Sequence, residues 1–151
     1  MIKKILFIGV LFAIACKNTK QTASYELAKE MYQKDTLYYL SPDSLDNEKL
    51  LGKEIVTYGK IVQIKHHQIK DSDKMMYFIN LNKRYSNNSM TLMLFVDTYK
   101  GDFQKMHKLE GKTIFVKGKV EKLPEYREEG IPLKPSIKLI NEDQIKIISD
   151  F

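Results

Sequence analysis

The sequence predicts an all-β domain, a small five-stranded barrel with one short helix between its third and fourth strands. Three observations support this prediction. Residues 51–64 and 110–123 are two similar strand-like segments, each with a glycine in its middle. Several other segments alternate between apolar and polar residues, which is typical of strands. Residues 102–109 instead carry apolar side chains at helical spacing.

The two similar segments share the pattern G-K-x-I-x-x-x-G-K-(I/V), at residues 52–61 and 111–120. A glycine inside a strand weakens that strand and marks a bulge or a sharp bend. A small barrel needs such bends where one strand passes from one sheet into the next. Gly59 and Gly118 therefore predict two bent strands and a closed barrel.

The expected elements follow in the order strand, strand, strand, helix, strand, strand. They are the strands 55–65, 75–82 and 90–97, the helix 102–109 with Asp102 as its N-cap, the strand 113–123, and an interrupted fifth strand over 136–140 and 144–148. Residues 83–89 are rich in turn formers and predict a hairpin loop between the second and third strands.

The start of the chain has a different character from the rest. Two lysines precede an apolar run over residues 5–14, which is too short to span a bilayer as a stable helix and is typical of a secretory signal peptide. The run ends in A-I-A-C at residues 13–16. This ending resembles the lipobox of bacterial lipoproteins, which implies cleavage after residues 1–15 and a lipid on Cys16. The alternative is a buried cysteine behind an ordinary cleavage site.

Residues 16–40 are expected to be the lipidated Cys16 and a tether. Residues 17–22 are polar and aperiodic, as in a flexible spacer. Ser24 is a candidate cap for a short helix through Gln33, and residues 35–40 are apolar enough for a strand or a strap. The barrel domain is expected to occupy residues 41–151.

Composition limits the alternatives. The chain has 151 residues and 43% of them are hydrophobic, which suffices for one domain with a core. Without Lys3 and Lys4, 23 basic residues face 19 acidic ones, a net charge of +4 that permits an acidic partner without demanding one. Cys16 is the only cysteine, so the sequence excludes a disulfide framework and argues against a cysteine-ligated metal.

The element order resembles the OB-fold, a five-stranded Greek-key barrel. The resemblance covers about residues 50–148 and rests on an ordered set of motifs. They are G-K at 52–53 and 59–60, Y-F-I-N-L at 77–81, Y-S-N at 85–87, L-E-G-K at 109–112 and V-K-G-K-V at 116–120. Together they look like small bacterial nucleic-acid-binding domains of the anticodon-binding and exonuclease-subunit type. The loop 124–135 departs from that family because it is longer and more charged.

Alternation divides the second and third strands into two faces. The inward set is expected to be Met75, Tyr77, Ile79 and Leu81 with Met90, Leu92, Leu94 and Val96. The outward set contains Phe78, Asn80, Met93 and Phe95. Expected basic neighbours are Lys65 in a loop 65–70, Lys83 and Arg84 in the hairpin, and Lys117 and Lys119 on the fourth strand. Tyr85 in the hairpin is a further expected ligand contact.

Aromatic rings beside cations suit a stacked nucleic-acid strand, at about 1–3 kcal/mol per stacked base. The alternative is that the N-terminal helix around Leu27 and Met31, or residues 37–39, packs over this face and buries it.

Catalytic patterns are not apparent. His66 and His67 are adjacent, so on a strand they point to opposite faces, and the sequence supplies no further ligands for a shared metal. The glutamates of residues 125–129 alternate with Tyr126 and Arg127 as in a solvated loop. We expect no metal, no cofactor and no enzymatic activity.

Two functions are consistent with these patterns. The first is an envelope-anchored OB-fold lipoprotein that binds single-stranded nucleic acid or another polyanion. The second is a protein-interaction or structural lipoprotein of the cell envelope without a nucleic-acid ligand. In both, a monomer attached to the bacterial membrane by its N-terminal lipid faces the periplasm or the cell exterior.

Overall fold

The computed structural model describes residues 25–32, 39–40, 48–69, 72–84, 87, 90–122 and 135–148. It divides into two compact units, Met1–Leu37 and Tyr38–Phe151. The described part of the first unit is a helix over residues 25–32, inside the range that the sequence predicts for a helix. The predicted signal peptide, Cys16 and the polar spacer lie outside the described residues.

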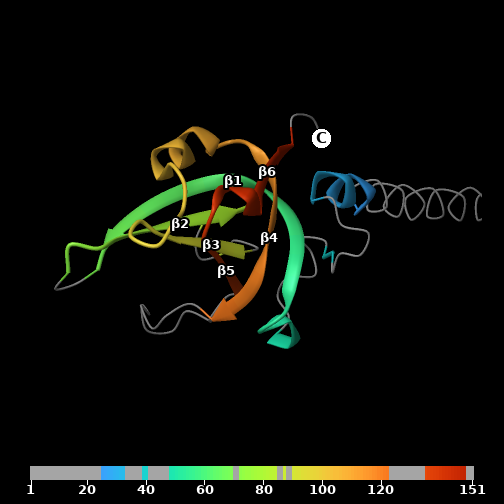
Figure 1. Cartoon of the computed structure of the whole chain (residues 1–151), viewed down its shortest axis with the longest axis horizontal. Helices are drawn as coiled ribbons and strands as arrows, with labels where there is room; N and C mark the ends of the chain where they lie inside the picture. The colour runs from blue at the N-terminus through green and yellow to red at the C-terminus, as the bar shows by residue number, and fades with distance from the viewer. Residues whose placement is uncertain are drawn as a thin grey trace, which may run out of the picture. The chain divides into compact units, whose positions relative to one another are not determined.

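The described part of the second unit is mostly strand, with three short 3-10 helices (Figure 1). Its elements are η2 (Glu48–Leu50), β1 (Glu54–Gln68), β2 (Met75–Leu81), β3 (Met90–Phe95), η3 (Phe103–Leu109), β4 (Thr113–Lys122), β5 (Pro135–Leu139), η4 (Glu142–Gln144) and β6 (Ile145–Ile148). The predicted helix is a 3-10 helix, and its predicted cap is confirmed because Asp102 Oδ1 accepts a hydrogen bond from Gln104 N at 3.0 Å.

The sheet closes on itself as an OB-type barrel. Its strand order is β1-β2-β3-β5-β4-β6, and an additional β1–β4 pairing makes a ring of the first five. β3 and β5 are parallel, and the other pairs in the ring are antiparallel. β5 pairs with Val120–Lys122 of β4, and β6 pairs with Thr113–Val116. The prediction of an interrupted fifth strand is therefore confirmed.

Each predicted bend lies where a strand changes partner. β1 pairs with β4 up to Lys60 and with β2 from Ile61 onward, and Figure 1 shows it strongly curved. Gly59 lies at this change. A Cβ atom on Gly59 would lie 3.0 Å from Leu81 Cβ, and one on Gly118 would overlap Ile137 Cγ2. Both glycines are therefore needed for the close approach of a neighbouring strand.

The sequence repeat is also a structural repeat. Gly52 and Gly111, at the start of the two copies, have φ angles of 80° and 83°, a conformation that favours glycine. Gly52 N donates to Val120 O at 2.8 Å, and Gly111 N donates to Ile61 O at 2.8 Å. Each turn is thus bonded to the strand of the other copy, and together they close the barrel.

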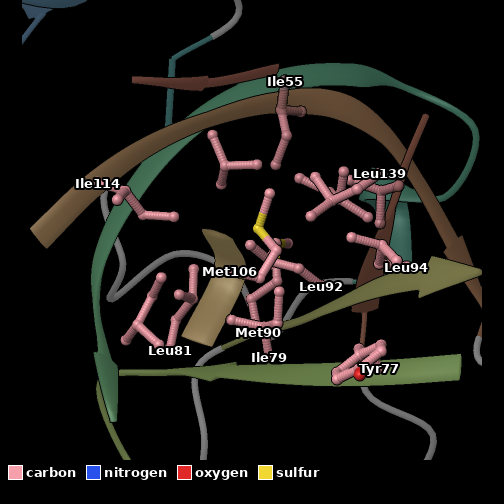
Figure 2. Packing of buried hydrophobic residues seen from close by; sticks show 14 of the residues in the cluster. Ile55, Tyr77, Ile79, Leu81, Met90, Leu92, Leu94, Met106, Ile114 and Leu139 are labelled. Carbon is pink, nitrogen blue, oxygen red and sulfur yellow. The ribbon is translucent and has the colours of Figure 1, made fainter. Parts of the chain in front are cut away.

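The core lies inside the ring (Figure 2). Side chains from β1, β2, β3, η3, β4 and β5 converge there. The predicted inward residues Tyr77, Ile79, Leu81, Met90, Leu92 and Leu94 belong to this cluster, and Val96 packs against it. The prediction for Met75 is wrong. Its side chain is 38% exposed because Met75 begins β2 opposite Gln68, next to the loop that joins β1 to β2.

Two segments extend the barrel beyond the predicted boundaries. β1 runs through His67 to Gln68 and remains paired with β2, so most of the predicted loop 65–70 is strand. Before the barrel, Tyr39 forms a parallel bridge with Val56, and Leu40 N donates to Val56 O at 2.9 Å. This strap occupies the edge of β1 that β2 does not reach, and it shields a strand edge from other chains.

Candidate ligand-binding surface

The outward face of the barrel brings most of the predicted binding residues together. Strand pairing aligns Lys65 of β1 with Phe78 of β2, Phe78 with Met93 of β3, and Met93 with Lys138 of β5. Phe95 lies one step along β3 on the same face, because alternate residues of a strand point the same way. We call these five residues the outer surface. It is a row of apolar side chains with a lysine at each end.

Exposure differs within the outer surface. Met93 is 2% exposed, whereas Phe78 and Phe95 are partly exposed and Lys65 is exposed. Met93 lies between Phe78 and Lys138 in the row, so the side chain in the middle of the row is not accessible to a ligand. The two phenylalanine rings and the flanking lysine remain the accessible groups. The outer surface is thus neither fully open nor fully covered.

Asn80 lies beneath this surface and is 1% exposed. Its Nδ2 donates to Gln63 Oε1 at 2.9 Å, and its Oδ1 accepts from Thr91 Oγ1 at 3.0 Å. In line with them, Ser136 Oγ donates to Glu121 O at 3.0 Å. The first two bonds tie β2 to β1 and to β3, and the third separately ties β5 to β4. Both polar atoms of the Asn80 amide therefore hold neighbouring strands, and a ligand would have to displace them.

Lys138 is a member of the outer surface that sequence reasoning missed. Its Nζ lies 5.0 Å from the centroid of the Phe95 ring, in a cation–π arrangement. Alternation along the fifth strand would have shown that Lys138 faces outward, but not that β5 lies beside β3. The ammonium is held where an anionic group on a ligand stacked against Phe95 would meet it.

The hairpin residues lie beyond the Asn80 end of β2. Lys83 and Arg84 are exposed, and Lys83 N donates to Leu81 O at 2.8 Å. Tyr85, also predicted to bind ligand, lies outside the described residues. The two described cations can therefore extend the outer surface along β2.

Lys117 and Lys119 lie elsewhere on the barrel. They face outward on β4, opposite Val56 and Glu54 of β1, and do not share the strands of Phe78 and Phe95. They line a surface groove of about 350 Å³ over Gly118, which Lys138 also lines. Lys138 therefore connects the groove with the outer surface. The residues predicted to form one site therefore lie in two adjoining places, the outer surface and the groove.

Charges in the groove are balanced. Its three lysines face Glu54, Glu121 and Asp143, and Lys117 Nζ lies 4.0 Å from Glu54 Oε1. The groove is therefore polar without being strongly positive. This balance follows from strand pairing, which sets Glu54 beside Lys119 and Glu121 beside Ser136.

The two adjacent histidines lie on β1 and not in the predicted loop 65–70, and as neighbours on a strand they point to opposite faces. His66 pairs with Tyr77 on the inward side, and His67 pairs with Met76 on the outward side. His107 of η3 also meets Tyr77, with ring centroids 5.3 Å apart. Within the described ranges, no three His, Cys, Asp or Glu side chains are grouped so that they could hold a metal ion. The same ranges contain no helix with the length and hydropathy to cross a membrane.

Comparisons with known proteins identify the fold. No protein-family model matches the chain, and no curated protein matches it. The aspartyl-tRNA synthetase of Entamoeba histolytica superposes with a TM-score of 0.51 at 14% identity, over 78% of this chain and 22% of that one. The likeness supports the OB-type barrel and concerns the fold alone.

Two further solved structures are similar at lower scores. RecG bound to a three-way DNA junction has a TM-score of 0.44 and 16% identity, over 74% of this chain and 12% of RecG. An OBody bound to hen egg-white lysozyme has a TM-score of 0.45 and 15% identity, over 74% of this chain and 93% of the OBody. The chain spans about a fifth of the synthetase and still less of RecG.

Proposed function

We propose that this protein is an OB-fold lipoprotein of the bacterial envelope whose outer surface binds a single-stranded nucleic acid or another flexible polyanion. The observation that supports this function best is the row Lys65, Phe78, Met93 and Lys138, with Phe95 beneath the Lys138 ammonium. Flat rings between cations suit a ligand with flat groups on an anionic backbone, and stacking contributes about 1–3 kcal/mol per base. The proposed activity is binding rather than catalysis.

The membrane anchor in this proposal is a lipid on Cys16. The sequence A-I-A-C at residues 13–16 supports it, and the polar residues 17–22 would separate the lipid from the barrel. Two or three acyl chains hold a protein firmly, because each buried CH₂ contributes about 0.8 kcal/mol. The barrel would then face the periplasm or the cell exterior.

A second candidate function is interaction with another envelope protein. It is favoured by the groove over Gly118, which is lined by three lysines, three carboxylates and Ile140, and Ile140 is 47% exposed. Balanced charges around an exposed apolar side chain suit a protein surface better than a polyanion.

A titration at several salt concentrations tests the nucleic-acid proposal. The full chain in neutral detergent is titrated with single-stranded DNA, RNA, neutral glycans and mixed micelles that contain an anionic lipid. We expect Phe78→Ala and Phe95→Ala to weaken oligonucleotide binding by about 1–3 kcal/mol each. The matched control is Phe103→Ala, because Phe103 is a partly exposed ring on η3 next to Tyr77. It should leave binding unchanged.

The alternative makes the opposite prediction for the same variants. If another part of the chain covers the outer surface, Phe78→Ala and Phe95→Ala lower the melting temperature markedly, because truncating a buried Phe costs about 3–5 kcal/mol. A chain that binds no polyanion at low salt and melts lower on losing either ring would rule out the nucleic-acid proposal and leave the protein-interaction candidate.

Metabolic labelling with a fatty-acid analogue tests the anchor separately. We expect incorporation into the wild-type chain and none into Cys16→Ser, which should remain uncleaved or leave the membrane fraction. A wild-type chain without label would overturn the lipoprotein assignment and leave the ligand question unaffected.

A further inference from the structure

The break in the fifth strand is bridged by a single side chain. β5 ends at Leu139 and β6 begins at Ile145, so residues 117–119 of β4 have no strand partner on that edge. The carboxamide of Gln144 lies in the gap. Its Oε1 accepts hydrogen bonds from Ile140 N and Asn141 N, and its Nε2 donates to Lys117 O and Lys138 O, both at 3.1 Å.

These four bonds use the full capacity of a carboxamide, which has two acceptor positions and two N–H donors. Only an uncharged amide provides this combination, since a carboxylate has no donor and an aliphatic side chain has neither. Gly118 leaves the space for it, because a Cβ atom there would lie 3.0 Å from Gln144 Nε2. The amide, the glycine and the strand break are therefore parts of one arrangement.

The two backbone carbonyls that accept hydrogen bonds from Gln144 belong to lysines of the candidate ligand-binding surfaces. One is that of Lys138, whose ammonium lies over the Phe95 ring on the outer surface. The other is that of Lys117, whose side chain lines the groove. The same amide is thus bonded to the backbone of one lysine of the outer surface and of one lysine of the groove.

We propose that Gln144 is a positioning residue of the ligand site. By bonding the Lys138 carbonyl, it holds the end of β5 so that the Lys138 ammonium stays over Phe95 and meets the anionic backbone of the ligand. Gln144 itself does not contact the ligand. The role in binding rests on the proposed function, whereas the placement of Lys138 can be measured without any ligand.

The first experiment measures the position of Lys138 in the full chain in detergent micelles by NMR. A proton over an aromatic ring is shifted upfield, and Phe95→Leu identifies which part of the Lys138 side-chain shift is due to the ring. We expect Gln144→Ala to lose most of that shift. The matched control is Gln104→Ala on η3, where the side chain is exposed and makes none of the four bonds of the Gln144 amide. It should keep the shift.

The second experiment titrates the same variants with a twelve-nucleotide oligothymidylate at low salt. We expect Gln144→Ala to weaken binding about tenfold, the size expected if one contact between the Lys138 ammonium and the ligand is lost. Gln104→Ala should bind like wild type.

The pH response of Gln144→Glu separates positioning from general destabilisation. The carboxylate cannot donate to the Lys117 and Lys138 carbonyls, but the protonated acid can donate to one of them. We therefore expect the Lys138 shift to be lost at neutral pH and partly recovered as the pH falls toward about 4, near the ordinary pKa of Glu. Gln104→Glu adds the same charge on η3 and should show no such recovery.

Each outcome has a separate meaning. If the wild-type chain shows the Lys138 shift but binds no oligonucleotide, the proposed function fails and the positioning role is judged on the shift alone. If Gln144→Ala keeps the shift, the positioning role is overturned. If Gln144→Ala does not fold, Gln144→Glu decides, and the absence of any recovery at low pH overturns the inference.

Discussion

The two glycine corners of the barrel begin from almost the same sequence and end as different surfaces. At both corners a strand glycine lies under an apolar residue and a side-chain amide. At Gly59 these are Leu81 and Asn82, which lie next to each other in the chain. At Gly118 they are Ile137 and Gln144, which lie on either side of a strand break. At the first corner the end of β2 and the residue after it lie against the glycine, and at the second corner a groove lies over the glycine.

This difference shows that the repeated glycine motif specifies a bend in its own strand but not which segment packs against the glycine. Asn82 N and Oδ1 both bond the backbone of Lys60, as a neighbouring strand end would. The side chain of Gln144, the last residue of η4, donates a hydrogen bond to Lys117 O. A groove therefore forms only where the crossing strand is interrupted.

The largest expected effect is that of Gly118→Val. Its side chain would overlap Ile137 Cγ2 and crowd the Gln144 amide, so two elements would have to move. We expect a loss of about 3 kcal/mol in the free energy of unfolding, measured by denaturant titration. Lys119→Val introduces the same side chain at the exposed neighbour and should be nearly neutral. Equal stability of both variants would contradict the close approach at this corner.

Gly59→Val should cost less, about 1–2 kcal/mol in the free energy of unfolding. Its Cβ would approach Leu81 Cβ and Asn82 Oδ1 at 3.0 Å each, and the end of the Asn82 side chain can shift. The same denaturant titration measures it, with Lys60→Val as control. A greater loss here than at Gly118 would reverse the comparison between the corners.

Asn82→Gly tests the amide at the first corner. Asn82 has a φ angle of 67°, so glycine keeps the backbone conformation and removes only the side chain. Losing the bond from Lys60 N to Asn82 Oδ1 should lower stability by about 1 kcal/mol. Thermal melts of Asn82→Gly and Asn82→Ala measure this. The alanine variant should melt lower, because it also strains the backbone, and an equal or higher melting temperature would show that the conformation carries no cost.

The smallest expected effect distinguishes two equivalent lysines. Lys60 and Lys119 each follow a corner glycine and are exposed, but only Lys119 lines the groove. If the groove extends the polyanion site, Lys119→Ala should reduce the salt dependence of oligonucleotide binding by about 0.7 in the log–log slope, equivalent to one phosphate contact on a single strand. Lys60→Ala should leave the slope unchanged. Equal effects of the two changes would indicate non-specific attraction.

Much of the barrel could be predicted from local patterns. Alternation placed Tyr77, Ile79 and Leu81 inward, and the element order predicted the ring of five strands. The ends of strands were less predictable. β1 continues through His66 and His67 because β2 pairs with it, and this pairing energy is not visible in the polar sequence of residues 65–68.

The candidate site shows the same division. The sequence by itself determined that Met93 and Phe95 share a face, because that depends only on the two-residue period of a strand. Phe78 joined them because the more apolar set of alternate residues in each strand was placed inward. It could not determine that Lys138 covers Phe95 or that Lys117 and Lys119 line a separate groove. Those relations depend on which strands become neighbours and in what register, and register is decided by the packing of the whole barrel. Only the tertiary structure, by closing the ring with a broken fifth strand, set Gln144 between them.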